Sequence, residues 1–299
     1  HALQGRATGD VAYSELASHL RELYSTGTPI VALCAAGIVI RCIAPMLANK
    51  GVEPPVLAVA EDGSAVVPLL GGLAGVNVLA REIARALDVA PAITTSGELR
   101  FGTCLLNPPA GFALGDLALG KRFVSDLLAG ETVRIEGSAP WLADAQLPQD
   151  PEARLTVHVG HAERTPTANE LLIYPRNVLV AVNAGVADLP QAIREALHQA
   201  NIAVQSVALL LAADRDMADP SLREAALELG VPLRFASDTA ALRGRARNAV
   251  DQPVSIFGDD AIAIAVAEHP LQPLSIGRPR GRLAVIGLGP GAAELMVPA

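Results

Sequence analysis

Hydrophobic residues along this chain occur in short unbroken runs of Val, Ile, Leu and Ala more often than in strict alternation with polar residues. Unbroken runs are typical of strands that are buried on both faces of a sheet, with helices packed on each side. In the first hundred residues these runs predict a buried strand at 29–33 and a helix at 38–47. They also predict strands at 56–60 and 65–70, joined by an Asp-Gly hairpin turn, and a helix at 77–87.

The rest of the chain continues this pattern, and two of its helices carry clear boundary signals. Asp188 and Pro190 introduce one helix. A second begins at Asp219-Pro220 and stops at Gly230, which fits Asp at an N-cap, Pro just inside a helix and Gly after its end. The remaining predicted elements are helices at 121–128 and 260–267 and strands at 91–94, 132–135, 155–159, 171–174, 178–182, 204–211, 232–235 and 254–257.

This alternation is most regular after residue 177, and it predicts an α/β fold with two or three modules. Each module is expected to hold a mostly parallel sheet flanked by helices, as a three-layer sandwich. The predicted domains are residues 1–99, a middle region at 100–175 with an exposed excursion at 137–154, and a C-terminal domain at 176–276. Residues 277–299 are interpreted as a Gly-Arg-Pro-Arg-Gly linker followed by the first strand of a further domain.

Composition narrows the class of protein. The 299 residues are 51 % hydrophobic, 3 % aromatic and 18 % charged, which excludes global disorder and requires an aliphatic core. The net charge is −8 without any run of Lys or Arg, so we expect no nucleic-acid partner. The longest apolar stretch, 31–47, contains Arg41 and Pro45, which argues against a membrane span. Three cysteines without CxxC spacing fit a reducing cytoplasm and no disulfide.

A glycine-rich turn is the strongest candidate binding element. Gly71, Gly72 and Gly75 fall between a predicted strand and a predicted helix. Such a turn lets backbone N–H groups approach an anion, and the start of a helix favours negative charge. Arg41 is a candidate partner for a carboxylate. The alternative interpretation is that these glycines serve only close packing between helix and strand.

Histidine and cysteine suggest no metal site or nucleophile. His158 and His161 are three residues apart, but no Cys or carboxylate cluster accompanies them, so we expect exposed loop histidines and no bound metal. Cys34, Cys42 and Cys104 are expected to be core residues, because free cysteine is commonly buried. Motifs of the GxSxG, Walker and HExxH types do not occur.

Three stretches, in this order and spacing, resemble the cobalt-precorrin-5A hydrolase family. They are 36–47 followed by Asn49-Lys50, then Asp62-Gly63 leading to the glycine turn, and finally 92–95. The resemblance is strongest over 29–112 and is traceable to about residue 276. It implies a role in cobalamin biosynthesis, in which a lactone on a cobalt-precorrin ring is opened and acetaldehyde is released. The substrate-binding residues that it implies are Gly37, Arg41, Gly71, Gly72, Gly75, Asn77, Thr94 and Thr95.

The last part of the chain, 285–291, is similar to the opening of tetrapyrrole methyltransferases. Some members of the precorrin-3B C17-methyltransferase branch carry a hydrolase-like region in front of that domain. The resemblance implies that Gly287, Gly289 and Gly291 border an S-adenosylmethionine site once the rest of such a domain is present. The hydrolase-like part itself is expected to hold no cofactor.

The sequence also departs from the hydrolase pattern. Family members usually have His in the glycine turn, where this chain has Leu73 and Ala74, and Asp soon after the Thr pair, where it has Glu98. The C-terminal stretches 182–185 and 214–219 and the helix at 260–267 also differ from the family. Several changes together predict a degenerate module that is retained for substrate binding, docking or folding.

Three functional hypotheses follow. The first is a non-catalytic module that binds a precorrin-type tetrapyrrole beside a methyltransferase domain of the same polypeptide. The second is an active lactone hydrolase, with Asp62, Glu98 and Asp116 as candidate acid–base groups. The third is a purely structural domain. Pairing with a second copy as a homodimer is left open.

Overall fold

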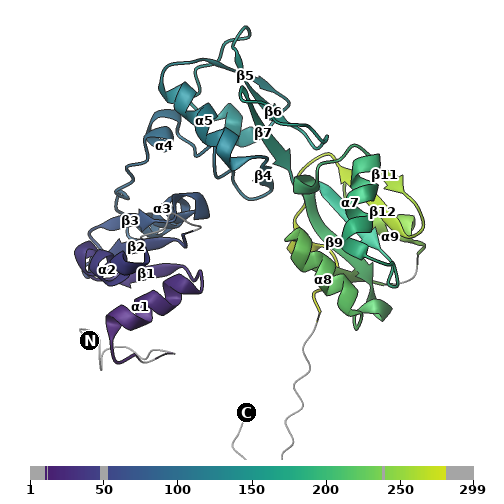
Figure 1. Cartoon of the computed structure of the whole chain (residues 1–299), viewed down its shortest axis with the longest axis horizontal. Coiled ribbons are helices and arrows are strands. Elements are labelled where there is room, and N and C mark those ends of the chain that lie inside the picture. Colours follow the sequence, from purple (N-terminus) through teal and green to yellow (C-terminus); the bar gives the residue numbers. More distant parts are fainter. Residues whose placement is uncertain (1–10, 12, 48–52, 238–239, 281–299) are drawn as a thin grey trace, which may run out of the picture. The chain divides into compact units, whose positions relative to one another are not determined.

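The computed structural model describes residues 11, 13–47, 53–237 and 240–280. The chain divides into two compact units. The first comprises the described residues within His1–Pro109, Leu114–Val159 and Pro166–Ile173, and the second comprises those within Ala110–Ala113, Gly160–Thr165 and Tyr174–Ala299. Three sheets flanked by helices confirm the predicted α/β class (Figure 1), and these sheets are mixed, with parallel strand pairs in each of them.

The first sheet has the strand order β1-β2-β3. β1 is parallel to β2, and β2 pairs antiparallel with β3 through the predicted Asp-Gly turn. Helices α1 and α2 pack on one face of this sheet, and α3 packs on the other. The elements are α1 (Leu16–Ser25), β1 (Ile30–Leu33), α2 (Ala36–Ile43), β2 (Val56–Val59), β3 (Val66–Leu70) and α3 (Val76–Ala86).

β1 is an edge strand, and the prediction of a strand buried on both faces is wrong. Ile30 lies in the core beneath α1 and α2, whereas Val31 and Leu33 point to the other face and are 44 % and 53 % exposed. On that face α3 packs against β2 and β3 and leaves β1 uncovered.

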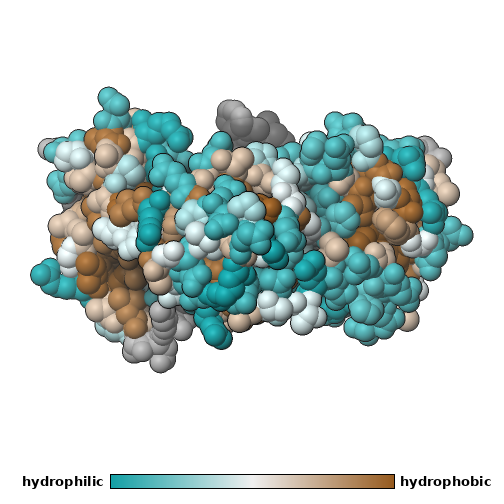
Figure 2. Space-filling model, turned by 90° about the horizontal axis from the view of Figure 1, so that it is seen from above, coloured by the Kyte–Doolittle hydropathy of each residue, from teal (hydrophilic) through white to brown (hydrophobic). Residues whose placement is uncertain are grey.

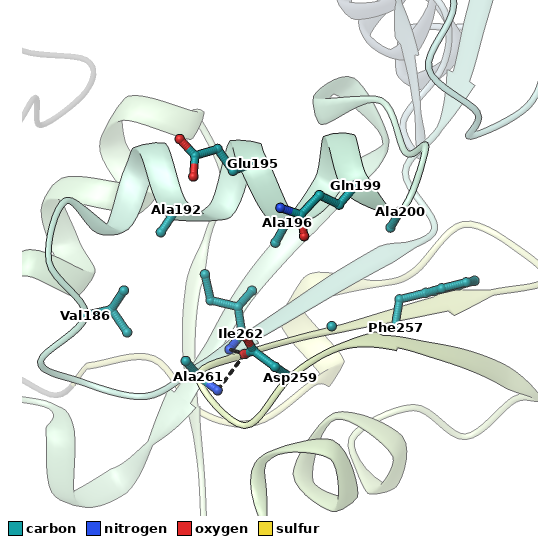
Figure 3. A pocket seen from close by; sticks show the side chains of 11 residues that line it. Val186, Ala192, Glu195, Ala196, Gln199, Ala200, Phe257, Asp259, Ala261 and Ile262 are labelled. Atoms are coloured by element: carbon teal, nitrogen blue, oxygen red, sulfur yellow. Dashed lines mark hydrogen bonds between the residues drawn. The ribbon is translucent and has the colours of Figure 1, made fainter.

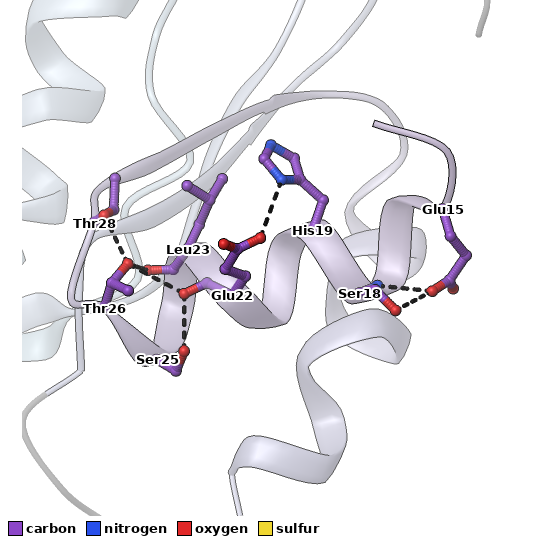
Figure 4. Close-up of polar contacts among 8 residues, drawn as sticks. All are labelled: Glu15, Ser18, His19, Glu22, Leu23, Ser25, Thr26 and Thr28. Carbon is purple, nitrogen blue, oxygen red and sulfur yellow. Dashed lines mark hydrogen bonds and ion pairs between the residues drawn. The ribbon is translucent and has the colours of Figure 1, made fainter. Parts of the chain in front are cut away.

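Helix α1 was not among the predicted elements. Figure 4 shows the polar contacts at its two ends. The Glu15 carboxylate accepts a hydrogen bond from the backbone N–H of Ser18 at 3.1 Å and so caps the first turn. At the other end the Thr26 hydroxyl donates to the carbonyls of Glu22 and Leu23. Glu is not one of the usual N-cap residues, which explains why the start signal is weak.

The second sheet has the order β4-β7-β6-β5, with β5, β6 and β7 parallel. The predicted excursion at 137–154 is instead partly buried, because Leu142 and Leu147 join the core and the segment around Gln149 lies along β5. The predicted strand at 91–94 makes only an isolated bridge between Pro91 and Val66, since Pro offers no N–H to a ladder. The elements are α4 (Ser96–Phe101), β4 (Phe112–Leu114), α5 (Leu117–Leu128), β5 (Val133–Glu136), α6 (Pro140–Ala143), β6 (Leu155–Val159) and β7 (Glu170–Pro175).

The third sheet, in the second unit, has the order β10-β9-β8-β12-β11. β8, β9 and β10 are parallel, while β12 and β11 are antiparallel additions at one side. The predicted helix at 260–267 is therefore wrong: these residues form β12, which is buried along its whole length between β8 and β11. The elements are β8 (Val178–Val182), α7 (Leu189–Gln199), β9 (Val207–Ala213), α8 (Pro220–Leu229), β10 (Leu233–Ala236), α9 (Leu242–Asn248), β11 (Val254–Gly258) and β12 (Ile262–Ala267).

The boundary signals of α7 and α8 are confirmed. Asp188 accepts a hydrogen bond from the Gln191 N–H, and Asp219 accepts one from the Ser221 N–H at 2.8 Å. Gly230 ends α8 in the left-handed region at φ 64°. Local side-chain chemistry is thus sufficient to place these helix ends.

Figure 2 shows apolar patches separated by hydrophilic residues on the face of the molecule that it presents. Within the described ranges, no helix combines the length and the apolar character needed to cross a bilayer.

Candidate functional site

The glycine turn connects β3 to α3 through the single-turn 3-10 helix η2 (Gly72–Ala74). Gly71 and Gly75 are both left-handed, at φ 82° and 92°, and the N–H groups of Ala74 and Val76 donate to the Gly71 carbonyl. A Cβ on Gly71 would lie 2.4 Å from the Pro54 carbonyl oxygen, so this glycine is required for packing. A Cβ on Gly72 would meet nothing within 4 Å. The packing interpretation of the turn therefore applies to Gly71, whereas Gly72 faces open space.

Helix α3 begins directly after this turn without a side-chain cap among the described residues. The N–H groups of a first helical turn have no acceptor within the helix, and the helix dipole is positive at that end. This start therefore suits an anion approaching from the open side of Gly72.

A polar cluster centred on the buried side chains of Asn77 and Glu98 lies beside the start of α3. Asn77 donates to the Thr95 hydroxyl at 3.0 Å and also to the carboxylate of Glu98. Arg81, one turn along α3, pairs with the other oxygen of Glu98 at 3.2 Å. The Glu98 side chain is only 3 % exposed. Burial, and secondly the charge of Glu98, raise the pKa of the Cys104 thiol, so this cysteine is held as the neutral thiol.

The structure brings Asn77, Thr95 and Glu98 together, as three separately predicted site residues. Arg81 was missed, although its position four residues after Asn77 places it on the same face of α3. Gly37 and Arg41 do not contact this cluster: the guanidinium of Arg41 donates to the Gly37 carbonyl within α2 at 3.2 Å.

Thr94 precedes α4 and is exposed. The predicted methyltransferase residues Gly287, Gly289 and Gly291 lie outside the described residues.

The other two candidate acids have local structural roles. Asp62 accepts hydrogen bonds from the Ser64 hydroxyl and N–H in the β2–β3 turn, and these bonds lower the pKa of its carboxyl group. Asp116 caps α5 by accepting from the Leu119 N–H at 2.7 Å. The Asp62 turn packs near Leu87 at the far end of α3. Ten residues of helix separate Leu87 from Asn77, which is about 15 Å.

His158 corrects another prediction. It lies in β6 with its side chain 12 % exposed, not in an exposed loop. Its Nδ1 lies 3.0 Å from a Glu136 oxygen and its Nε2 lies 2.9 Å from a Glu170 oxygen. The parallel register places Glu136 directly beside His158, which the sequence spacing does not reveal. Within the described part of the chain, no group of three or more His, Cys, Asp and Glu has the arrangement of a metal site.

The three cysteines are partly buried and do not lie fully in the core as predicted. Burial raises the pKa of the Cys34 thiol, as it does for Cys104. Neither environment activates a thiolate.

The second unit holds a crevice of about 610 Å³ between α7 and the β11–β12 turn (Figure 3). Ala192 and Ala196 line it from the helix, and Phe257 and Ile262 line it from the strands. Its charged lining residues, Glu195 and Asp259, are both acidic. A crevice with this charge is unfavourable for a polycarboxylate, which leaves the glycine turn of the first unit as the better candidate.

The fold and this site define an α/β protein whose N-terminal region has an open glycine turn, a helix start without a side-chain cap and an Asn-Glu-Arg cluster around a buried carboxylate. Residues 18–98, which include all three features, match the family described as Cobalamin synthesis G N-terminal. Through this region the chain is distantly related to the cobalt-precorrin-5A hydrolases of cobalamin biosynthesis.

Two curated relatives are both cobalt-precorrin-5A hydrolases. The protein of Priestia megaterium is 34 % identical over 82 residues, which cover 27 % of this chain and 22 % of the relative. The protein of Salmonella typhimurium is 36 % identical over 84 residues, which cover 28 % of this chain and 24 % of the relative. The matched segment thus spans less than a quarter of the length of these relatives.

A solved structure of a cobalamin biosynthesis protein G homolog from Sulfolobus solfataricus aligns with 84 % of this chain and 92 % of its own length. The identity is 16 % and the TM-score is 0.31, so this likeness supports no argument about fold or function.

Proposed function

We propose that the N-terminal region binds a precorrin-type tetrapyrrole as a non-catalytic module of cobalamin biosynthesis. The observation that carries the proposal is the open turn at Gly72 beside the uncapped start of α3, within the segment related to cobalt-precorrin-5A hydrolases. The peripheral carboxylates of a precorrin ring are the anions that such a helix start accepts. In the first turn of α3, the N–H groups of Val76 and Leu79 already donate to the carbonyls of Gly71 and Gly75. A ring carboxylate would approach the remaining first-turn N–H groups from the side of Gly72.

Lactone opening needs a group that activates water or protonates the leaving oxygen. The glycine turn offers Leu73 and Ala74 where the hydrolase pattern has His. Glu98 is the one carboxylate of the buried cluster, and its two oxygens are already engaged by Arg81 and Asn77. With both oxygens engaged, this carboxylate is poorly placed to orient a water molecule, which favours binding without hydrolysis.

Lactone hydrolysis is the second candidate function, because a buried carboxylate beside the turn is also where a catalytic acid–base group would be expected. In that case Glu98 would exchange its hydrogen bond from Asn77 for one from a water molecule when substrate binds. The two functions differ in one product, acetaldehyde.

The test is a spectral titration with cobalt-precorrin-5A, coupled to detection of acetaldehyde by an alcohol dehydrogenase that consumes NADH. We expect a saturable change in the tetrapyrrole spectrum without acetaldehyde. Gly72→Asp places a negative charge at the open side of the turn and is expected to weaken binding about tenfold, a loss of about 1.4 kcal/mol. Gly72→Ala is the matched control with the same backbone constraint and no charge.

A titration without any spectral change would overturn the binding proposal. Stoichiometric or catalytic acetaldehyde would replace it by hydrolysis, and loss of that acetaldehyde in Glu98→Gln would identify the group responsible.

We also propose that this module belongs to a polypeptide with a precorrin-3B C17-methyltransferase domain that uses S-adenosylmethionine. The support is the resemblance of 285–291 to the opening of such domains. A polypeptide that continues beyond Ala299 is expected to bind S-adenosylmethionine in calorimetric titration, whereas residues 1–280 are expected not to. Absence of binding by the longer polypeptide would refute the fusion.

A further inference from the structure

The outer strands of the three sheets differ in how their free edges are covered. Segments around Pro91 and Gln149 lie along β3 and β5. β10 exchanges two backbone hydrogen bonds with Arg278, and the guanidinium of Arg243 donates to two carbonyls of β11. Cover of this kind keeps an edge strand from pairing with another chain. Apart from the three-residue β4, β1 is the edge strand that has no such cover among the described residues.

The free edge of β1 presents both backbone groups and apolar side chains. The Ile30 N–H donates to the Pro55 carbonyl, on the side of β2. Because the backbone groups of successive residues in a strand point to opposite sides, those of Val31 and Leu33 point away from β2. Within the described part of the chain, these outward groups form no hydrogen bond. The side chains of Val31 and Leu33 are 44 % and 53 % exposed, on the face that α3 leaves open.

The charge of this region selects the partner. No Asp, Glu, Lys, Arg or His occurs between residues 23 and 40. A strongly charged partner would therefore find no opposite charge along β1. Two copies of a chain with a net charge of −8 repel each other in general, but a contact through this stretch brings no like charges together. A second copy of the chain is thus the partner that fits this edge.

We propose that two copies of this chain associate by antiparallel pairing of their β1 strands about a two-fold axis at Ala32. In this register Val31 of each copy lies opposite Leu33 of the other, and these two residues exchange both of their outward backbone hydrogen bonds. The same patch serves both copies, as a two-fold interface requires. The apolar side chains of both strands then lie together on one face. The proposal does not depend on tetrapyrrole binding at the glycine turn.

The first measurement is sedimentation velocity of the whole chain over a range of concentrations. A pair of four-residue strands is a small interface. Interfaces below about 1,200 Å² belong to weak complexes, so we expect a monomer–dimer equilibrium with a dissociation constant of about 10–100 µM. A range from about 5 to about 200 µM covers this equilibrium.

Lysine variants locate the interface. Val31→Lys and Leu33→Lys each place an ammonium group against the apolar side chains of the other copy, and both are expected to keep the chain monomeric over the whole range. Both positions are exposed, so the fold should tolerate the change. Leu227→Lys, at a position 71 % exposed on α8, is the matched control and is expected to dimerise like the unchanged protein.

Amide hydrogen exchange of the unchanged protein, followed by NMR, tests the register. The N–H groups of Val31 and Leu33 should exchange about threefold more slowly at the highest concentration than at the lowest, because the dimer bonds them. The Ala32 N–H, which already points to β2, should change little. A chain that stays monomeric throughout, or a dimer that survives both lysine variants, would overturn the proposal. Equal protection of Val31 and Leu33 at every concentration would show that the edge is covered within one chain, and would overturn it as well.

Discussion

Gly71 and Gly72 are adjacent, and the structure predicts opposite results when each is replaced by alanine. At Gly71 the new Cβ would lie 2.4 Å from the Pro54 carbonyl oxygen, and the backbone would stay at φ 82°. A left-handed conformation costs a residue with a Cβ about 1–2 kcal/mol. Overpacking against backbone adds about 1–3 kcal/mol. We therefore expect Gly71→Ala to lower the free energy of unfolding by about 2–5 kcal/mol, as the sum of these two effects.

At Gly72 neither effect applies, because its Cβ would meet nothing within 4 Å and its φ is not left-handed. Alanine also reduces the freedom of the unfolded chain, which stabilises a protein by about 0.4–1 kcal/mol where the conformation is compatible. Gly72→Ala is thus expected to unfold at the same urea concentration as the unchanged protein or slightly above it.

The assay is urea unfolding followed by the fluorescence of Trp141, the single tryptophan of the chain, which lies in the first unit. Circular dichroism of the whole chain would mix the transitions of the two units, so the local probe is preferable. Equal midpoints for Gly71→Ala and Gly72→Ala would refute the assignment of Gly71 to packing. They would also weaken the distinction between the two glycines on which the proposed binding mode depends.

Three further predictions concern carboxylates. Glu98→Leu removes the acceptor of the buried Asn77 amide and the partner of Arg81, and we expect the free energy of unfolding measured in urea to fall by about 1–3 kcal/mol. In Glu98→Gln it should fall less, because the amide oxygen still accepts from Asn77. Asp116→Ala removes the N-cap of α5 and should lower the unfolding free energy by about 1 kcal/mol without changing the tetrapyrrole spectrum, whereas a changed spectrum would place Asp116 in the site. Hydrogen bonds from two backbone N–H groups lower the pKa of Asp259 in the folded chain. Its contribution to the free energy of unfolding is therefore present above the ordinary pKa of 3.8 and is lost as the pH falls through the lower folded pKa. Acid unfolding of Asp259→Asn should consequently depend less on pH in that range, and identical acid profiles would contradict this.

The sequence was a good guide wherever neighbouring residues carry the information. The strand at 178–182 agrees with β8, and Asp219 and Gly230 mark the ends of α8 as predicted. These features depend on contacts within a few residues, such as the hydrogen bond from the Ser221 N–H to Asp219. The resemblance over the N-terminal region likewise depends on local motifs, and the family match over residues 18–98 confirms that part of it.

The predictions failed where the structure of a segment depends on residues that are distant in the sequence. Residues 262–267 alternate Ile, Ala and Val, which fits a helix or a strand, and only their place between β8 and β11 makes them β12. His158 was interpreted as exposed because Glu136 and Glu170 come beside it only through strand register.

The candidate site shows the same division. The sequence by itself determined the glycine turn, the helix that follows it and the residue types Asn77, Thr95 and Glu98, because turn chemistry and helical period are local properties. Tertiary structure alone decided that Gly71 serves packing, that Gly72 faces open space and that Arg81 engages Glu98. Those outcomes depend on which surfaces meet after the chain has folded, since burial and ion pairing are set by atoms that are far apart in the sequence.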